Sequence, residues 1–216
     1  MSCCNHCRDA GELFSDRLSV KELKRYRKKG PAKLTKLLLD GIRQQQGVAG
    51  KSLIDIGGGV GAISFELFED GLAESIQVDA SEAYLAASKK EAKKRGLDEK
   101  MWHRYGDFTE LAEELEPADI VTLDRVICCY PDMEKLLTLS VQKARNVFAF
   151  SFPKKRWYVR TGLSFTNLYL KITGSDFRVY FYPPDKMDEV IRNLGFSRKS
   201  TSQTWSWEAA VYTRTG

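Results

Sequence analysis

The chain has 216 residues, of which 43% are hydrophobic and 29% are charged, a composition typical of one globular domain with a substantial core. No apolar run has the length of a membrane-spanning helix, and the N-terminal residues lack the apolar segment of a secretion signal. The five cysteines are odd in number and include the adjacent pair Cys128 and Cys129, which does not resemble a disulfide framework. We therefore expect a reduced, cytoplasmic protein.

The net charge of +5 is gathered mainly in two basic segments, residues 21–36 and the cluster of Lys154, Lys155, Arg156 and Arg160. Such segments are either solvated faces or surfaces that attract an anionic small molecule or a membrane, and the sequence leaves both interpretations open. No nucleic-acid recognition motif accompanies them, so we do not expect nucleic acid as the main partner. The sequence indicates no oligomeric state.

Short apolar runs alternate with amphipathic segments along most of the chain. This pattern predicts an α/β fold, with a mainly parallel sheet and helices on both faces. A helical N-terminal arm, residues 1–44, comes first; it breaks at Gly30-Pro31, before a helix over 32–42. The expected strands cover 52–57, 75–79, 101–105, 118–124 and 146–152, and the helices between them cover 61–69, 81–95, 108–115 and 132–144.

The C-terminal part of the chain departs from this alternation. An aromatic and basic insertion, residues 153–182, follows the fifth strand; we expect a helical substrate cap there, with an amphipathic helix packed on the sheet as the alternative. A helix over 185–194 then ends at Gly195. Strands over 196–203 and 205–213 are close enough in sequence to pair as an antiparallel hairpin. The predicted domain therefore covers 45–216 and holds seven strands.

The most informative segment is SLIDIGGGVG, residues 52–61, in which an apolar run leads into Gly57, Gly59 and Gly61. It predicts a buried strand, a tight turn and a helix whose free N–H groups point at whatever lies in the turn. Glycine suits such a turn because its backbone takes unusual φ values and because a ligand can approach without meeting a Cβ atom. Dinucleotides and S-adenosylmethionine are the two cofactor classes that use it.

Asp55 favours the second class. The dinucleotide fingerprint is present as Gly57-x-Gly59-x-x-Ala62, with Asp79 at the distance of a ribose-binding acid. However, the carboxylate of Asp55, two residues before the first glycine, would oppose a pyrophosphate. S-adenosylmethionine has no phosphate and carries a sulfonium and an ammonium group, so we expect it as the cofactor.

The seven strands, the C-terminal hairpin and the glycine turn resemble the class I S-adenosylmethionine-dependent methyltransferases over roughly residues 45–214. The resemblance implies a seven-stranded Rossmann-like sheet with the cofactor at the carboxyl ends of its strands. Asp79 and Ala80 would bind the ribose and Gly106, Asp107 and Phe108 the adenine, although both acids could instead cap the following helices. The methionine end would meet Asp55, Gly57, Gly59 and Gly61, and the sulfonium side would meet Leu123 and Asp124.

The acceptor would lie over the segment 124–132, and the candidate catalytic residues are Tyr26, Asp124, Cys129 and Tyr130. A closer resemblance is to the magnesium-protoporphyrin O-methyltransferases, which methylate a porphyrin propionate. It rests on Tyr130-Pro131, on the segment 151–154 (SFPK) and on Tyr26 as a tyrosine of the N-terminal arm. The chain departs from that family at Cys129, where the family has a histidine.

The N-terminal cysteines Cys3, Cys4 and Cys7, with His6, are half of a zinc site, and no second half follows at the usual spacing. The sequence leaves two interpretations open: a tail with incidental thiols, or, if the N-terminus folds across the active site, a soft metalloid held together with Cys128 and Cys129.

The leading hypothesis is methylation of a small molecule, anionic or aromatic, by in-line transfer to an O or S nucleophile. The alternatives are porphyrin-like carboxylate O-methylation, metalloid or thiol methylation, RNA methylation guided by the basic arm, and a non-catalytic module that binds S-adenosylmethionine.

Overall fold

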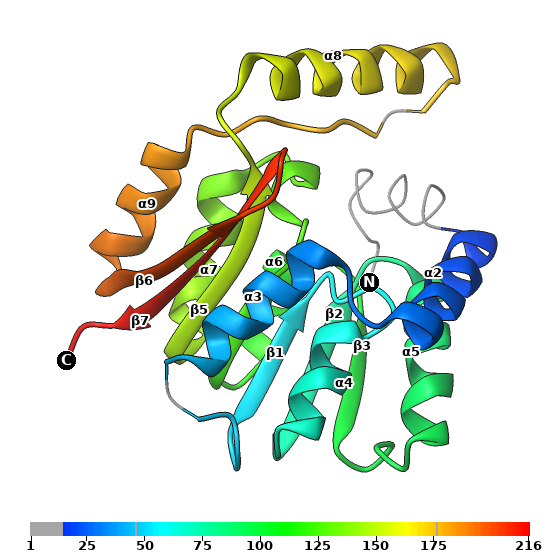
Figure 1. Cartoon of the computed structure of the whole chain (residues 1–216), viewed down its shortest axis with the longest axis vertical. Helices are drawn as coiled ribbons and strands as arrows, with labels where there is room; N and C mark the ends of the chain where they lie inside the picture. The colour runs from blue at the N-terminus through cyan, green and yellow to red at the C-terminus, as the bar shows by residue number, and fades with distance from the viewer. Residues whose placement is uncertain (1–14, 46, 176) are drawn as a thin grey trace.

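The structure is a computed structural model that describes residues 15–45, 47–175 and 177–216 (Figure 1). The N-terminal cysteine cluster lies outside these residues. Two helices open the described chain, α2 (Asp16–Lys29) and α3 (Lys33–Arg43). Between them, Gly30 takes a φ of 69°, where a side chain would be strained, and Pro31 follows it. The break predicted at Gly30-Pro31 is therefore confirmed.

Seven strands form one sheet in the order β3-β2-β1-β4-β5-β7-β6. The first five are parallel: β1 (Ser52–Ile56), β2 (Glu74–Asp79), β3 (Met101–Tyr105), β4 (Ala118–Leu123) and β5 (Ala144–Pro153). β7 (Trp207–Arg214) lies antiparallel between β5 and β6 (Phe196–Gln203). This arrangement confirms the predicted Rossmann-like sheet and its C-terminal hairpin.

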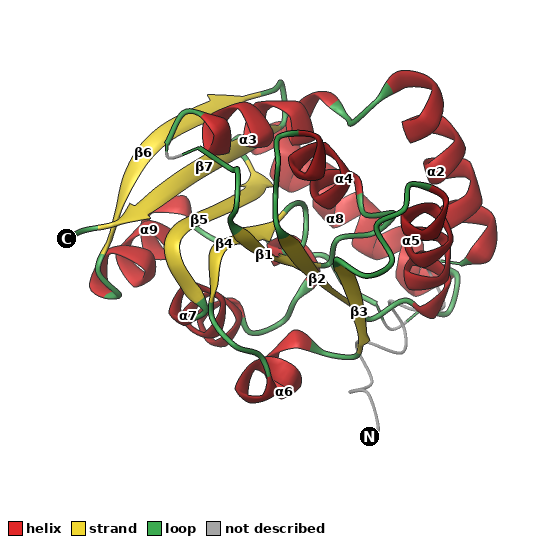
Figure 2. Cartoon of the chain, turned by 90° about the horizontal axis from the view of Figure 1, so that it is seen from below, coloured by secondary structure: helices red, strands yellow, loops and turns green. Residues whose placement is uncertain are grey.

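Helices cover both faces of the sheet (Figure 2). One face carries α3, α4 (Ala62–Glu69) and α5 (Glu82–Lys94), and the other carries α6 (Phe108–Leu111), α7 (Met133–Gln142) and α9 (Pro184–Asn193). Neighbouring residues of a strand therefore point into different cores, which makes the central strands apolar throughout. Leu53 and Val147 belong to the core under α3, and Ile54 and Phe148 belong to the core under α7 and α9.

Several predicted boundaries differ from the structure, and the largest differences have local causes. The helix expected over 108–115 is the short α6 followed by a 3₁₀ turn, Ala112–Glu114. The helix expected to end at Ala144 stops at Gln142, because Ala144 already pairs with Ala118 as the first residue of β5. The last strand begins at Trp207 because the chain turns just before it, where the N–H of Thr204 donates to the carbonyl of Trp207 at 2.8 Å.

α3 is part of the cover of the sheet. Leu38 and Leu39 are fully buried in one core with Ala209 and Val211 of β7. The division of the chain into an arm (1–44) and a domain (45–216) stays a prediction, and this packing joins α3 to the domain.

The insertion after β5 contains α8 (Trp157–Ile172), which lies across one end of the molecule (Figure 1). The chain returns to α9 through residues 177–183, which we call the strap. The side chain of Asn167 binds the strap twice, to the N–H and the carbonyl of Val179, both at 2.8 Å. Leu170 is the one buried residue of α8, so the helical insertion is confirmed, whereas the alternative of a helix packed on the sheet is wrong.

Candidate functional site

A cavity of about 230 Å³ lies at the carboxyl ends of β1, β2, β3 and β4. The strand order reverses there, between β1 and β4, which is where open parallel sheets bind ligands. Of the residues predicted for the cofactor, those that line the cavity are Gly57, Gly59, Asp79, Ala80, Gly106, Asp107 and Phe108. Of those predicted for the acceptor, Asp124, Cys129 and Tyr130 line it.

The glycine turn forms the wall after β1. Gly57 and Gly59 have φ values of 63° and 56°, in the left-handed region where side chains are strained. A Cβ atom on Gly57 would overlap the side chain of Val126. The N–H of Gly57 donates to the carbonyl of Val78 in β2 at 2.7 Å and so holds the start of the turn against that strand. The backbone of the turn therefore meets the cavity without intervening side chains.

Asp79 is held rigidly where β2 ends. Its Oδ2 accepts from the N–H of Gly59 and its Oδ1 from the N–H of Ser81, both at 2.9 Å. Burial raises the pKa of Asp79 to about 6, although these N–H groups act in the opposite direction. The N-cap of α5 is Ser81, whose hydroxyl accepts from the N–H of Tyr84 at 3.3 Å. Asp79 is thus not needed as the cap, and its carboxylate lines the cavity.

Asp107 caps a helix and also lines the cavity. It is the N-cap of α6, because its Oδ1 accepts from the N–H of Thr109 at 2.8 Å. Its Oδ2 accepts from the hydroxyl of Tyr130 at 2.9 Å, and that hydroxyl also lies 2.7 Å from the hydroxyl of Thr109. Tyr130 was expected on the acceptor side, but the structure ties its hydroxyl to the acid predicted for adenine.

Three residues predicted for the cofactor lie behind the cavity wall. Leu123 is fully buried in the core. A Cβ atom on Gly61 would lie 2.6 Å from the hydroxyl of Ser88, so this glycine permits the packing of α4 on α5. Asp55 lies beneath the turn, 1% exposed, where its Oδ1 accepts from the hydroxyl of Thr122 at 2.7 Å. None of the three lines the cavity, which corrects the expectation that Asp55 and Gly61 surround the methionine end and that Leu123 lines the sulfonium side.

The other oxygen of Asp55, Oδ2, has no hydrogen-bond partner among the described residues. Burial raises the pKa of Asp55 to about 7; the hydrogen bond from Thr122 opposes the shift, and the charges of Asp124 and Asp79 add to it. A buried carboxylate oxygen without a partner is costly in an apolar interior. It lies next to the turn, since a Cβ atom on Gly58 would come within 2.5 Å of it.

Tyr26 does not reach the cavity. Its buried ring stacks on Phe65 of α4, with ring centroids 6.1 Å apart, and its hydroxyl donates to Glu66 at 3.1 Å. The guanidinium of Arg95 lies 5.4 Å from the centroid of the Tyr26 ring. These contacts fasten α2 to α4, so the catalytic role predicted for Tyr26 is wrong and its ring packs between the two helices.

The wall after β4 is built from distant parts of the chain. Asp124 accepts from the hydroxyl of Thr35 in α3 and from that of Ser151 in β5, both at 2.6 Å. Ser151 in turn accepts from the N–H of Arg125 at 2.8 Å. Arg125 has a φ of 61°, a strained value for a residue with a side chain, and such strain is often stored at functional sites. Its guanidinium lies 3.6 Å from Asp124 and 3.8 Å from Glu22.

Cys128 and Cys129 follow in a 3₁₀ turn, Ile127–Cys129, with their sulfur atoms 3.6 Å apart. The hydrogen bond from Cys128 and the charge of Arg125 lower the pKa of Cys129, while burial opposes the shift. The strap is fastened to the same loop. The N–H of Tyr180 donates to the carbonyl of Cys128 at 2.7 Å, and the hydroxyl of Tyr182 donates to the backbone carbonyl of Tyr130 at 2.7 Å.

Sequence reasoning did not single out Glu22, Tyr84 or Thr35, and it noted Ser151 only as part of the segment 151–154. Glu22 and Tyr84 line the cavity, and the hydroxyl of Tyr84 donates to Glu22 at 2.7 Å. Glu22 is an acid in the otherwise basic segment 21–36, and that contrast was the one signal for it in the sequence. The hydroxyls of Thr35 and Ser151 carried no signal, because their function here depends on contacts between segments far apart in the chain.

A family model described as a methyltransferase domain matches residues 48–165, which is more than half of the chain. The chain belongs to the methyltransferase domain family. It is a class I S-adenosylmethionine-dependent methyltransferase, as the glycine turn and the strand order also indicate. No curated protein sequence matches the chain.

Solved structures of other methyltransferases share the fold. Magnesium protoporphyrin IX methyltransferase from Synechocystis PCC 6803, with bound S-adenosylmethionine, matches with a TM-score of 0.70 and 15% identity. The match covers 100% of both chains. The same enzyme with S-adenosylhomocysteine has a TM-score of 0.68 and 19% identity, over 84% of this chain and 82% of that one. An O-methyltransferase family protein from Burkholderia thailandensis has a TM-score of 0.69 and 13% identity, over 97% of this chain and 62% of that one.

Proposed function

We propose that this methyltransferase binds S-adenosylmethionine in the cavity and methylates a small, anionic acceptor at an oxygen or sulfur atom. The observation that carries the proposal is the position of Asp79, a carboxylate fixed by the N–H groups of Gly59 and Ser81 at the wall of the cavity, beside the glycine turn. A carboxylate in this position suits the two ribose hydroxyls of the cofactor, because it can accept from both.

The remaining wall also fits the cofactor. Gly57 and Gly59 leave room for the methionine end, and beneath them the Asp55 oxygen that has no partner among the described residues favours a cationic group nearby. Asp107, held by Thr109 and Tyr130, would accept from the adenine amine. When bound, S-adenosylmethionine supplies a methyl group that is already activated by the sulfonium. The protein therefore mainly has to align the acceptor with that methyl group.

The acceptor side favours an anion. Arg125 lines the cavity with a side chain that is 44% exposed, and the chain of hydrogen bonds from Asp124 through Ser151 fixes its backbone. Val126 and Leu136 add apolar surface to the same cavity. In this proposal Arg125 binds a carboxylate, phenolate or thiolate acceptor, which attacks in its ionised form and needs no general base. Asp124 then positions Arg125, and α8 with the strap caps the acceptor.

The test is a panel of carboxylic acids, phenols and thiols, each with a neutral analogue, scored by release of S-adenosylhomocysteine. We expect turnover of anionic acceptors, and Arg125→Gln should raise KM for the best of them about tenfold while its neutral analogue is unaffected. Arg104→Gln, which removes an exposed arginine on β3, is the matched control. Cofactor binding without turnover of any member of the panel would contradict a small-molecule acceptor.

A second candidate acceptor is a thiophilic trivalent metalloid, favoured by the 3.6 Å separation of the Cys128 and Cys129 sulfur atoms beside the cavity. Two thiols so close can bind one soft atom together. Phenylarsine oxide tests this directly: arsenic forms two As–S bonds, and its oxygen leaves as water with the two thiol protons. Tight stoichiometric binding that is lost in both Cys128→Ser and Cys129→Ser would support the site. Equal binding by either single variant would exclude it.

A further inference from the structure

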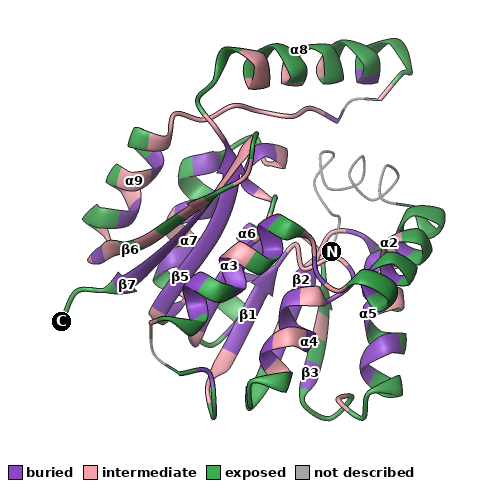
Figure 3. Cartoon of the chain, in the orientation of Figure 1, coloured by how far each residue is buried: buried purple, intermediate pink, exposed green. Residues whose placement is uncertain are grey.

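α8 has an outer face that packs on nothing in the described structure. The helix has sixteen residues, and Leu170 is the one that is buried (Figure 3). Six of the ten exposed large hydrophobic side chains in the described chain lie on α8 or beside it. Five belong to α8, namely Trp157 (78% exposed), Phe165 (66%), Leu168 (53%), Tyr169 (67%) and Ile172 (75%), and the sixth is Trp205 (76%). The exposed apolar surface is thus concentrated at one place.

These five side chains lie on one side of the helix, which we call the α8 apolar face. At roughly 100° per residue, their positions fall within an arc of about 120°. The opposite side of the helix carries Val159, Leu163 and Leu170, which are partly or fully buried, and Asn167, which holds the strap. The helix therefore has two apolar sides, and the one turned away from the molecule is the wider.

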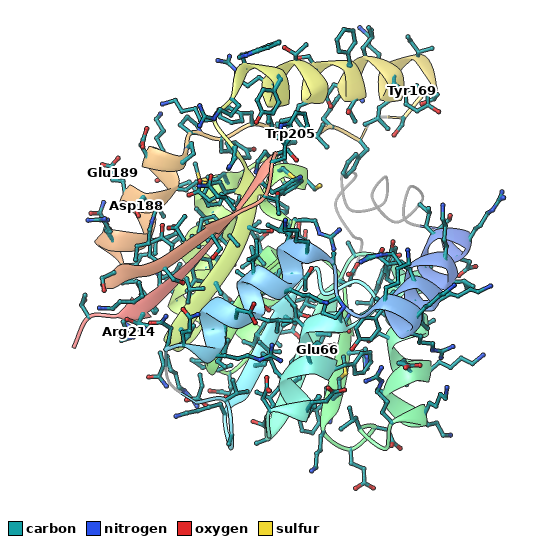
Figure 4. All side chains as sticks on the ribbon, viewed as in Figure 1. Glu66, Tyr169, Asp188, Glu189, Trp205 and Arg214 are labelled. Atoms are coloured by element: carbon teal, nitrogen blue, oxygen red, sulfur yellow. The ribbon has the colours of Figure 1, made fainter. Side chains whose placement is uncertain are left out.

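Trp205 extends this surface beyond the helix. Tyr158 stacks on Trp205 with ring centroids 4.6 Å apart and donates its hydroxyl to the Trp205 carbonyl at 2.9 Å. Figure 4 shows Tyr169 near one end of α8 and Trp205 below the other, at the tip of the β6–β7 hairpin. A contiguous exposed apolar surface of this kind marks an interaction site.

The charges around the α8 apolar face identify the partner. α8 contains no acid, and Lys154, Lys155 and Arg156 precede it while Arg160 and Lys171 lie within it. Lys155 pairs with Asp185 at 3.3 Å, whereas no salt bridge to Arg156, Arg160 or Lys171 exists among the described residues. Aromatic and aliphatic side chains flanked by cations match the interface of a bilayer that contains anionic lipids.

No helix in the described part of the chain is long and apolar enough to cross a membrane. At about 1.5 Å per residue, α8 is also shorter than the hydrocarbon core of a bilayer, which is about 30 Å thick. We propose that α8 lies flat in the interface of an anionic membrane, with the α8 apolar face among the lipids and Arg156, Arg160 and Lys171 at the headgroups. The enzyme is then held at the surface through its insertion.

The test is co-sedimentation of the full chain with vesicles of phosphatidylcholine, with and without phosphatidylglycerol, in the absence of cofactor and acceptor. The protein should bind the anionic vesicles at least tenfold more tightly than the neutral ones. The double variant Phe165→Ser/Ile172→Ser should lose at least tenfold in binding. The matched control is Leu18→Ser/Val20→Ser, which removes two exposed apolar side chains of α2 (41% and 63% exposed) and should bind like the wild type.

Arg156→Gln/Arg160→Gln should reduce the preference for anionic vesicles and weaken its dependence on salt. Wild-type protein that stays in the supernatant with both vesicle types would overturn the proposal. So would concentration-dependent self-association that Phe165→Ser/Ile172→Ser abolishes, in place of vesicle binding, because the face would then belong to a second copy. Since the assay omits cofactor and acceptor, its outcome is independent of that of the methyl-transfer assay.

Discussion

The two halves of the cavity are held together in different ways. On the side that we propose for the cofactor the decisive contacts are mostly local: Asp79 accepts from Ser81 two residues away and from Gly59 20 residues away, and Asp107 accepts from Thr109 two residues away. On the acceptor side they span the chain. Asp124 is bound by Thr35, 89 residues away, and Tyr130 by Tyr182, 52 residues away.

This difference indicates that the proposed cofactor side is determined by local sequence, whereas the shape of the proposed acceptor side depends on several distant segments. Short motifs fix the carboxylates of Asp79 and Asp107, because a turn and two helix starts contain most of their contacts. The acceptor side depends on α3, β5 and the strap together, so changes in any of these segments can reshape it without disturbing the cofactor. The variants below test this separation, in order of decreasing effect.

Gly59→Val should have the largest effect. The φ of 56° at this position strains any side chain, and a valine would project toward Tyr84, whose ring lies 3.4 Å from the added Cβ atom, inside the cavity. We expect at least a hundredfold loss of S-adenosylmethionine affinity by calorimetry. The control is Gly96→Val, a glycine with a φ of 69° and no atoms near its added Cβ, which carries the same backbone strain away from the site. Equal affinity in the two variants would refute the placement of the cofactor at this turn.

The same separation explains what the sequence predicted. The order of strands and helices, the hairpin and the acids after β2 and β3 follow from local periodicity and short motifs, and all appear in the structure. Tyr26 was misassigned because a tyrosine on an amphipathic helix packs in the same way whether it faces a ligand or a neighbouring helix. The strained backbone of Arg125 could not be predicted from the sequence, because the hydroxyl that holds it belongs to Ser151 in another strand.

Asp79→Ala should weaken cofactor binding by about 1–3 kcal/mol, the usual range for loss of a charged hydrogen-bonding partner. The N–H groups of Gly59 and Ser81 would also lose their acceptor. Asp98→Ala, in the loop before β3, is the control and should bind like the wild type. The same titration tests a nicotinamide cofactor: NAD or NADP that competes with S-adenosylmethionine would show that the turn holds a dinucleotide instead.

The effect of pH on S-adenosylmethionine affinity should be about tenfold, smaller than the effect of the glycine substitution. Burial raises the pKa of Asp79 to about 6, and the ribose hydroxyls need the ionised carboxylate as acceptor. At pH 5 about one molecule in ten is ionised there, so affinity should fall about tenfold between pH 7.5 and pH 5. Asp79→Asn should flatten this dependence. An unchanged pH profile in that variant would assign the proton to another group.

The stability of the free protein should depend on pH in the opposite direction to cofactor affinity: it should increase as the pH falls. The pKa values of Asp79 and Asp55, about 6 and about 7 in the folded protein, lie above those of the unfolded chain. The folded state therefore binds these protons more tightly. The contribution of the two acids to the free energy of unfolding should be largest below about pH 4 and be lost as the pH rises to about 7. Urea unfolding at several pH values measures it, and Asp55→Asn should remove part of the slope.

Tyr182→Phe should affect the acceptor side alone. The Tyr182 hydroxyl donates to the carbonyls of Tyr130 and Pro131, at 2.7 and 2.8 Å, and so fixes the strap to the loop that lines the cavity. Burial raises the pKa of Tyr182 to about 12, so the hydroxyl remains a donor at neutral pH. Its loss, worth about 1 kcal/mol, should raise the acceptor KM about fivefold and leave cofactor affinity unchanged.

The control is Tyr158→Phe, which removes a hydroxyl that donates to the Trp205 carbonyl, away from this loop. A loss of cofactor affinity in Tyr182→Phe would show that the two halves are coupled through Tyr130 and Asp107, because the hydroxyl of Tyr130 donates to that acid.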